Sequence, residues 1–274
     1  MWVGAFVLWL LVTTYPVQAQ QDPVEIRPRC FDCHLNPAPP EGTQSGPYID
    51  FRSFRRSVHG AQRCESCHRS VVDLPHAEHL PAVDCRDCHR PDNTAGAPQL
   101  KSYREFEESV HGGLVAADDP RAPRCQNCHG HHDILKPDDP ASHVNKLHLA
   151  GTCGHCHAEI AERYAGGSHG QQLALGNLTV PVCTDCHGEH AILRHDEAAS
   201  SVSRSHVVET CAQCHEDISR MKAIGRPTLM VETYRDSYHG VATKFGSGET
   251  ATCIDCHGHH GITGASDPTS PIHA

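Results

Sequence analysis

The sixteen cysteines of this 274-residue chain form eight CxxC pairs, and each pair is followed directly by histidine. Two thiols at this spacing can each bond to a vinyl group of one porphyrin, and the adjacent imidazole can then bind the iron. Zinc sites or disulfides would use the cysteines but would not need a histidine after every pair. The predicted attachment residues are Cys30, Cys33, Cys64, Cys67, Cys85, Cys88, Cys125, Cys128, Cys153, Cys156, Cys183, Cys186, Cys211, Cys214, Cys253 and Cys256. The predicted proximal iron ligands are His34, His68, His89, His129, His157, His187, His215 and His257. The pattern therefore predicts eight covalently attached haem c groups.

The opposite face of each iron needs a second ligand if both axial positions are to be occupied by the protein. Subtracting the eight motif histidines from 25 leaves 17, whereas only Met221 and Met230 follow the N-terminal segment as methionines. Histidine on both faces is therefore expected, which favours low reduction potentials. Four segments end in His-Gly with an aromatic residue five positions before the histidine: FRRSVHG, FEESVHG, YAGGSHG and YRDSYHG. Their histidines, predicted on the last turn of short helices that the glycine ends, are His59, His111, His169 and His239.

A second group of candidate ligands follows three of the motifs in the pattern CHGxHxI. Aligning CHGHHDI, CHGEHAI and CHGHHGI brings three histidines into register, with isoleucine two residues later in each case. His131 and His259 align with Glu189, so we expect them near the ligands or in solvent. The three histidines in register are His132, His190 and His260. They are predicted distal ligands.

The composition leaves little material for an ordinary hydrophobic core. Aromatic residues make up 5% of the chain, and both tryptophans lie in the first nine residues. Porphyrins are therefore expected to form the interior. The net charge of −10 argues against nucleic-acid binding, which needs a basic face. Strand patterns are nearly absent, so we predict a mainly irregular fold with short α-helices, wrapped around a stacked haem chain, with little or no β-sheet.

The N-terminus predicts export. Residues 2–12 are one apolar run, too short to span a bilayer, and small residues at 17 and 19 fit cleavage after Ala19. Residues 1–19 are therefore a predicted signal peptide, although a retained N-terminal anchor is the alternative. The expected location is the periplasm or the extracellular space.

The remaining chain is organised in repeats. We expect a three-haem module at 20–100, two-haem repeats at 101–158 and 159–220, and an incomplete one-haem repeat at 221–274. The His-Gly histidine precedes its CxxCH motif by 14 residues in all three repeats, and a further motif follows 28 residues later in the first two. A third interval of 28 predicts a ninth motif at 281, so the sequence is expected to end inside a repeat. The alternative is a natural chain that has lost its last half-repeat and keeps a spare histidine.

Over residues 30–274 the sequence resembles the multihaem cytochromes of the cytochrome c3/c554-like group. His76 and His79, in LPHAEHLPAVDCRDCH, resemble the HxxH element of cytochrome c3, in which both histidines are distal ligands of different haems. The resemblance implies a multihaem cytochrome c fold and an exported electron carrier with closely packed haems. With His76 and His79, the predicted distal ligands number nine.

These patterns predict an octahaem carrier of electrons along bis-histidine haems in a respiratory pathway, not an enzyme. The expected partners are redox proteins: a membrane quinol-linked donor and a periplasmic or extracellular acceptor. One alternative is a reductase or oxidase of a small nitrogen or sulfur compound, which needs an iron with an exchangeable face. Another is a subunit of an extracellular conducting filament, or another homo-oligomer, with a ligand donated between subunits. The histidines expected to be ordinary polar residues are His143, His148, His155, His195, His206 and His273.

Overall fold

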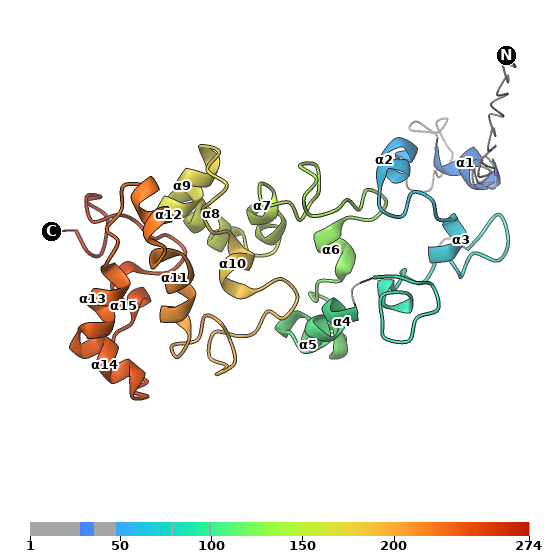
Figure 1. Cartoon of the computed structure of the whole chain (residues 1–274). Coiled ribbons are helices and arrows are strands. Elements are labelled where there is room, and N and C mark those ends of the chain that lie inside the picture. Colours follow the sequence, from blue (N-terminus) through green and yellow to red (C-terminus); the bar gives the residue numbers. More distant parts are fainter. Residues whose placement is uncertain (1–27, 36–47, 78, 99, 274) are drawn as a thin grey trace, which may run out of the picture.

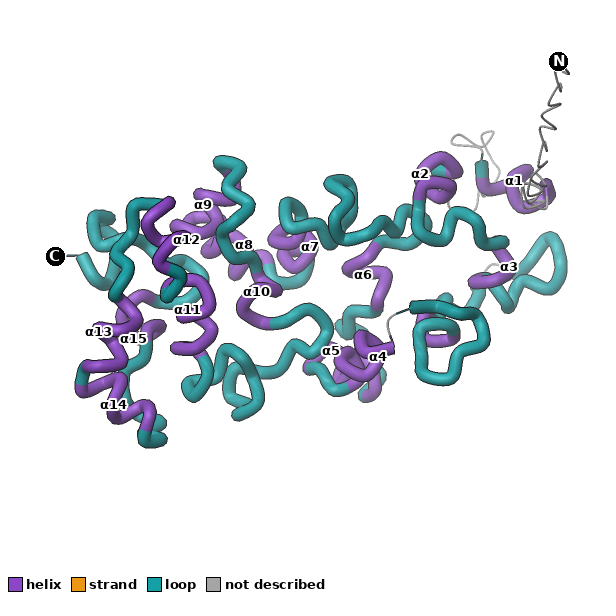
Figure 2. Tube along the Cα trace, in the orientation of Figure 1, coloured by secondary structure: helices purple, strands orange, loops and turns teal. Residues whose placement is uncertain are grey.

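The computed structural model describes residues 28–35, 48–77, 79–98 and 100–273. Within these ranges the chain is helical and contains no β-strand, which confirms the prediction of short helices with little or no sheet. The chain advances from one end of an elongated array to the other (Figure 1), and loops separate almost all of the helices (Figure 2). The predicted signal peptide lies outside the described residues. In the described part, every helix is too short or too polar to cross a membrane.

The helices are between four and nine residues long, apart from a three-residue 3₁₀ turn at Cys85–Asp87. Those of the first half are α1 (Pro28–His34), α2 (Phe51–Arg56), α3 (Cys64–Cys67), α4 (Leu100–Glu107), α5 (Val110–Ala116), α6 (Cys125–His129) and α7 (Leu149–Gly154). Those of the second half are α8 (Ala158–Gly166), α9 (Ser168–Ala174), α10 (Cys183–His187), α11 (Val207–His215), α12 (Ile218–Ala223), α13 (Met230–Asp236), α14 (Tyr238–Lys244) and α15 (Cys253–His257).

The prediction that glycine ends the helix bearing each His-Gly histidine is wrong. α4 ends before Ser109, and α5 begins directly after it, so His111 lies on the first turn of a new helix. The Ser109 hydroxyl accepts a hydrogen bond from the Gly112 N–H at 3.0 Å and donates one to the Phe106 carbonyl at 2.6 Å. A Cβ on Gly112 would collide with that same carbonyl oxygen, so glycine permits close contact between two helices. The pairs α8–α9 and α13–α14 repeat this hairpin.

The apolar core is small, as the composition predicts. Among the described residues, nine hydrophobic side chains are buried, and Met221 is the most deeply buried of them at 2% exposure. Leu149, Leu173, Val180 and Val182 form one buried cluster, with Tyr164 and the thiols of Cys153 and Cys183 at its edge. Side chains of the chain itself thus fill only local gaps between neighbouring helices.

Candidate functional site

Seven of the eight motif histidines face one other histidine across a narrow gap. Their ring centroids lie between 5.9 and 6.3 Å apart. In every pair the second ring is one of the histidines that the sequence predicts as a distal ligand. The pairs, motif histidine first, are His34–His76, His68–His132, His89–His59, His129–His190, His157–His111, His187–His260 and His215–His169.

The gap matches the size of a metal ion with one imidazole on each side. Metal–nitrogen bonds of about 2.0–2.1 Å on both sides place two ring centroids roughly 6.3 Å apart, when the ion lies on the line between them. The Nδ1 atoms of His215 and His260 are buried and have no hydrogen-bond partner. Unpartnered buried polar atoms are rare in folded proteins. The spacing of the paired rings therefore fits a bound group that the chain itself does not supply.

Burial favours the neutral form of most of the paired rings, which is the form in which imidazole binds metal. The pKa is lowered in nine of the fourteen paired histidines, and burial is the largest cause in each. The pKa of His260 falls to about 4. Two of the rings are oriented by backbone carbonyls. His76 Nδ1 lies 2.8 Å from the Ala77 oxygen, and His89 Nδ1 lies 3.1 Å from the Pro98 oxygen. An Nδ1–H that donates to a carbonyl leaves Nε2 free to bind metal.

The four pairs formed within residues 101–274 follow two rules along the chain. A His-Gly histidine faces the second motif of its own repeat, as in His111–His157 and His169–His215. A CHGxHxI histidine instead faces the first motif of the preceding repeat, and His190 accordingly lies opposite His129. The second kind of pair therefore joins consecutive repeats.

Two predicted distal histidines and one motif histidine stand outside this scheme. Within the described residues, His79, His239 and His257 face no partner imidazole across such a gap, and all three are exposed. The histidines expected to be ordinary polar residues are in no pair either. Several of them contact oxygen atoms instead: His143 lies 2.7 Å from an Asp133 oxygen, and His148 lies 2.9 Å from a backbone carbonyl.

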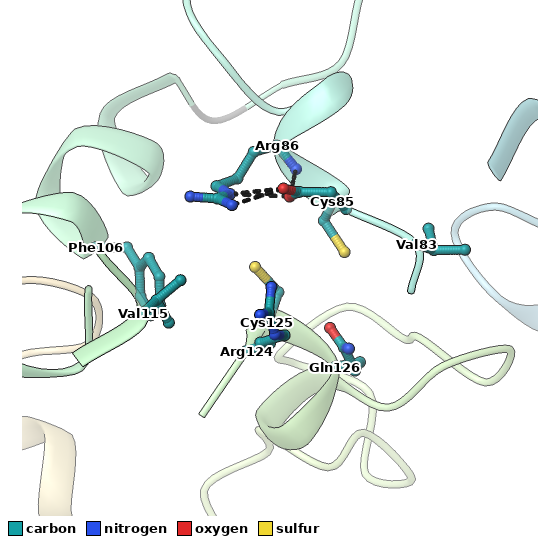
Figure 3. A pocket seen from close by; sticks show the side chains of 9 residues that line it. Val83, Cys85, Arg86, Phe106, Val115, Arg124, Cys125 and Gln126 are labelled. Atoms are coloured by element: carbon teal, nitrogen blue, oxygen red, sulfur yellow. Dashed lines mark hydrogen bonds and ion pairs between the residues drawn. The ribbon is translucent and has the colours of Figure 1, made fainter. Parts of the chain in front are cut away.

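The cysteines place the eight motifs in one continuous order. Cys85 shares a hydrogen bond with Cys125, and the two thiols point toward one another in a pocket beside the Arg86–Asp84 ion pair (Figure 3). First cysteines meet in this way at Cys30–Cys64, Cys85–Cys125, Cys153–Cys183 and Cys211–Cys253. Second cysteines are close enough to interact electrostatically at Cys67–Cys88, Cys128–Cys156 and Cys186–Cys214. Each motif therefore adjoins the next in the sequence, through alternate cysteines.

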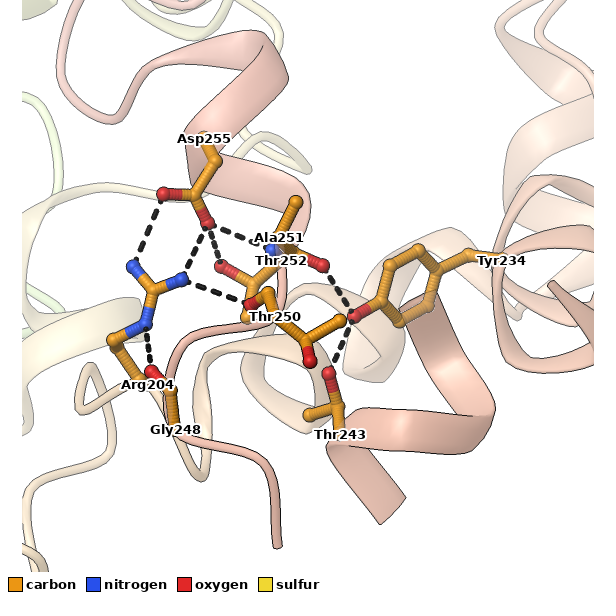
Figure 4. Close-up of polar contacts among 8 residues, drawn as sticks. All are labelled: Arg204, Tyr234, Thr243, Gly248, Thr250, Ala251, Thr252 and Asp255. Carbon is orange, nitrogen blue, oxygen red and sulfur yellow. Dashed lines mark hydrogen bonds and ion pairs between the residues drawn. The ribbon is translucent and has the colours of Figure 1, made fainter. Parts of the chain in front are cut away.

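Polar contacts hold the motif helices against the preceding repeat. Arg204 donates to both oxygens of Asp255, at 3.0 and 3.1 Å, and to the carbonyls of Gly248 and Thr250, both at 2.9 Å (Figure 4). Asp255 also caps α15 by accepting a hydrogen bond from the Thr252 N–H at 2.7 Å. One repeat earlier, a single contact of 3.3 Å between Lys146 and Asp185 occupies the same place.

Tyrosines anchor the loops that lead into two of the motif helices. The Tyr234 hydroxyl donates to the Ala251 carbonyl at 3.0 Å and lies 3.1 Å from the Thr243 hydroxyl (Figure 4). The corresponding Tyr164 donates to the Pro181 carbonyl at 2.9 Å. The hydroxyls of these two tyrosines thus give the aromatic position of the His-Gly segments a hydrogen-bonding role.

The isoleucine of each CHGxHxI segment has a role that the sequence did not reveal. Its carbonyl accepts a hydrogen bond from the residue directly before a His-Gly histidine of the preceding repeat or module. One backbone link thus accompanies every imidazole pair between repeats. The links are Val58 N–H to Ile134 at 2.8 Å, Val110 N–H to Ile192 at 2.9 Å and Ser168 N–H to Ile262 at 2.7 Å.

Comparison with known protein families, curated proteins and solved structures finds no match to this chain. The described residues contain no cluster of three or more His, Cys, Asp or Glu side chains arranged to hold a metal ion. The potential metal-binding geometry on the described chain is thus the two-imidazole pair beside a CxxC.

Proposed function

We propose that the protein is an octahaem c-type cytochrome that carries electrons along a linear series of bis-histidine haems. The observation that carries this proposal is the set of seven imidazole pairs, each of which joins a motif histidine to a separate histidine at a spacing of 5.9–6.3 Å. Chance proximity of surface histidines gives no reason for a repeated gap of one size. When bound, each haem supplies an iron centre that exchanges one electron, at a potential set by its axial ligands.

The residues of the chain have three tasks in this proposal. The cysteines hold each porphyrin covalently, and the paired imidazoles bind both faces of the iron. The contacts between successive motifs keep consecutive haems adjacent, as at Cys85–Cys125 and Cys128–Cys156. The Arg204–Asp255 and Lys146–Asp185 contacts hold that spacing between repeats.

The multihaem cytochrome c fold, export to the periplasm or beyond, and redox protein partners on either side belong to the same proposal. They rest on the CxxCH series, the HxxH element and the apolar N-terminal run. The reductase or oxidase alternative needs an open iron face, and the one observation in its favour is the exposed His257 without a facing imidazole in the described chain. The filament alternative would use the exposed His79 across a subunit contact.

The test is to produce the chain in a bacterium that matures c-type cytochromes and to count haems by pyridine haemochrome absorbance and intact mass. We expect eight per chain. The double change Cys183→Ser and Cys186→Ser should leave seven, whereas the control His195→Ala, an exposed histidine outside the pairs, should leave eight. A stable folded chain that carries zinc or disulfides and no haem would refute the proposal.

A further inference from the structure

The seven imidazole pairs differ in how the two ring planes are turned relative to each other. In four pairs the planes are nearly parallel, with angles between 3° and 24°. In the other three pairs they are inclined by 35° to 70°. The inclined pairs are His89–His59 at 70°, His157–His111 at 35° and His215–His169 at 45°.

The angle follows the sequence motif that supplies the distal histidine. Every inclined pair contains a His-Gly histidine, whereas the near-parallel pairs contain a CHGxHxI histidine or His76 of the HxxH element. His111 and His169 are the second residues of α5 and α9. His190 instead lies in the loop after α10, two residues beyond Gly188, whose φ is 79°. A histidine on the first turn of a helix and one in a loop that begins with glycine thus present differently turned rings to their partners.

The two kinds of pair alternate along most of the chain. Successive motifs adjoin through their cysteines, so neighbours in the sequence are also neighbours in space. From the second motif to the seventh, near-parallel and inclined pairs take turns at the motif histidines His68, His89, His129, His157, His187 and His215. The three inclined pairs therefore belong to motifs that do not adjoin one another.

Axial ligation is one of the means by which a protein sets the potential of a haem. Each imidazole donates π electron density to the iron d orbital that extends perpendicular to the ring plane. Parallel rings raise the same d orbital, and ferric iron has its electron vacancy there, so parallel rings stabilise the ferric form. Inclined rings divide the effect between two d orbitals and stabilise the ferric form less. An iron between inclined rings therefore accepts an electron at a more positive potential.

Arginine side chains favour reduction at two of the same sites. The Arg220 guanidinium donates a hydrogen bond to Cys214 Sγ at 2.7 Å, and that of Arg69 donates one to Cys88 Sγ at 3.5 Å. Both sulfurs belong to motifs of inclined pairs and would be bonded to the porphyrin. A cation beside a haem favours the ferrous form, because that form carries one positive charge less. Ring angle and local charge thus act in the same direction.

We propose that the irons bound by His89, His157 and His215 form a higher-potential set that is reduced first and stores up to three electrons on haems that do not adjoin. This inference rests on the proposed function and states how the chain fills with electrons. In each step a reduced donor loses one electron and a ferric iron gains it, and no covalent bond forms or breaks. Spacing the first three electrons apart limits the repulsion between them.

The first test is a potentiometric titration of the fully loaded chain, followed by low-temperature EPR, with haem content measured in parallel. Turning the ring planes apart brings the two d orbitals closer in energy and raises the largest g value of a low-spin ferric iron. Three irons should therefore show larger g maxima than the four near-parallel ones, and their signals should disappear first as the potential is lowered. His59→Ala should remove the largest g maximum, whereas His190→Ala should remove one of the smaller ones. The titration of the unaltered chain decides the order even if a ligand variant fails to fold.

Variants of Arg220 test the contribution of charge. At a fixed potential, Arg220→Gln should lower the ferrous-to-ferric ratio of one iron of the inclined set about 2- to 10-fold. Arg220→Lys, which keeps the charge, should restore most of that ratio. Lys222→Gln is the matched control, because it makes the same change in charge at an exposed residue of α12 that forms no ion pair within the described chain. It should leave the ratio unchanged.

The outcomes separate the two proposals. A chain without eight haems would refute the proposed function, and this inference with it. Eight haems whose low-spin irons all share one line shape would overturn the inference alone. So would irons with large g maxima that are reduced together with the others or after them. A shift in Lys222→Gln as large as that in Arg220→Gln would overturn the role of the Arg220–Cys214 contact.

Discussion

Replacing Arg204 with alanine should loosen the junction between the second and third repeats without unfolding the rest of the chain. The guanidinium makes four hydrogen bonds to the segment 248–255, two of them to backbone carbonyls and two to the Asp255 carboxylate. The Asp255 carboxylate also caps α15, and its hydrogen bonds to Arg204, the largest cause, and to Thr252 lower its pKa to about 2. One side chain therefore holds the loop and the motif helix together.

The magnitude follows from the exposure of these groups. Each bond to a carbonyl contributes about 0.5–1.5 kcal/mol. The ion pair is half exposed, with side chains 42% and 34% accessible, and contributes about 0.2–1 kcal/mol. Together the loss is about 1.2–4 kcal/mol, which raises the population of the locally open state roughly 8- to 900-fold. The loss in Arg204→Lys should lie between zero and that of Arg204→Ala, because a lysine can keep a single contact, as Lys146 does at 3.3 Å at the equivalent position.

Native-state hydrogen exchange resolved by residue is the appropriate assay, because local opening in a repeat array need not appear in a single unfolding transition. The amides of residues 250–258 should lose protection by that factor, while those of α6 and α10 keep theirs. Arg90→Ala is the matched control, since the exposed Arg90 side chain forms no ion pair within the described residues. Unchanged exchange at 250–258 in Arg204→Ala would refute the reasoning.

Three further predictions concern packing and ligation. Gly112→Ala should destabilise the α4–α5 hairpin by at least about 2 kcal/mol in thermal unfolding, because its Cβ meets a backbone carbonyl, whereas Gly113→Ala, with open space around it, should stabilise by about 0.5–1 kcal/mol. Equal effects of the two changes would contradict the hairpin geometry. His190→Ala should add one high-spin iron in EPR, and His195→Ala should add none. Met221→Ala, at 2% exposure, should cost about 2–5 kcal/mol, measured by the shift of the denaturation midpoint.

The residues of the seven pairs could be named from the sequence, but the pairing could not. Alignment of the repeats selects His132, His190 and His260 because they occupy one register after the motif. Their partners lie 61 to 73 residues earlier in the chain, in the preceding repeat or module. No local pattern encodes that distance, since it depends on how consecutive repeats stack.

A local sequence signal shows where the helices of the His-Gly segments begin. Ser109 and Ser237 lie two residues before their histidines and cap α5 and α14, and serine is a preferred helix N-cap. Glycine after the histidine is typical of a helix end, whereas the serine before it marks the start of α5 and of α14. Alignment of the repeats also relates Lys146 to Arg204, because each lies seven positions before a motif cysteine. Their shared role at the junctions could therefore have been predicted.

The imidazole pairs also bear on how such a chain folds. Few side chains are buried in the described residues, and each repeat is made of helices too short to be stable alone. An iron bound by both His129 and His190 would tie two consecutive repeats together, so ligation is itself a tertiary contact. Because a site of this kind exists only when both segments are in place, its binding free energy becomes folding free energy. Loss of an interior ligand such as His190 should therefore weaken the order of the adjoining repeat as well as open an iron, and hydrogen exchange at α6 and α10 would detect both repeats loosening together. If those helices kept full protection in His190→Ala, the polar and backbone links between repeats would suffice to hold the array, and ligation would serve redox chemistry alone.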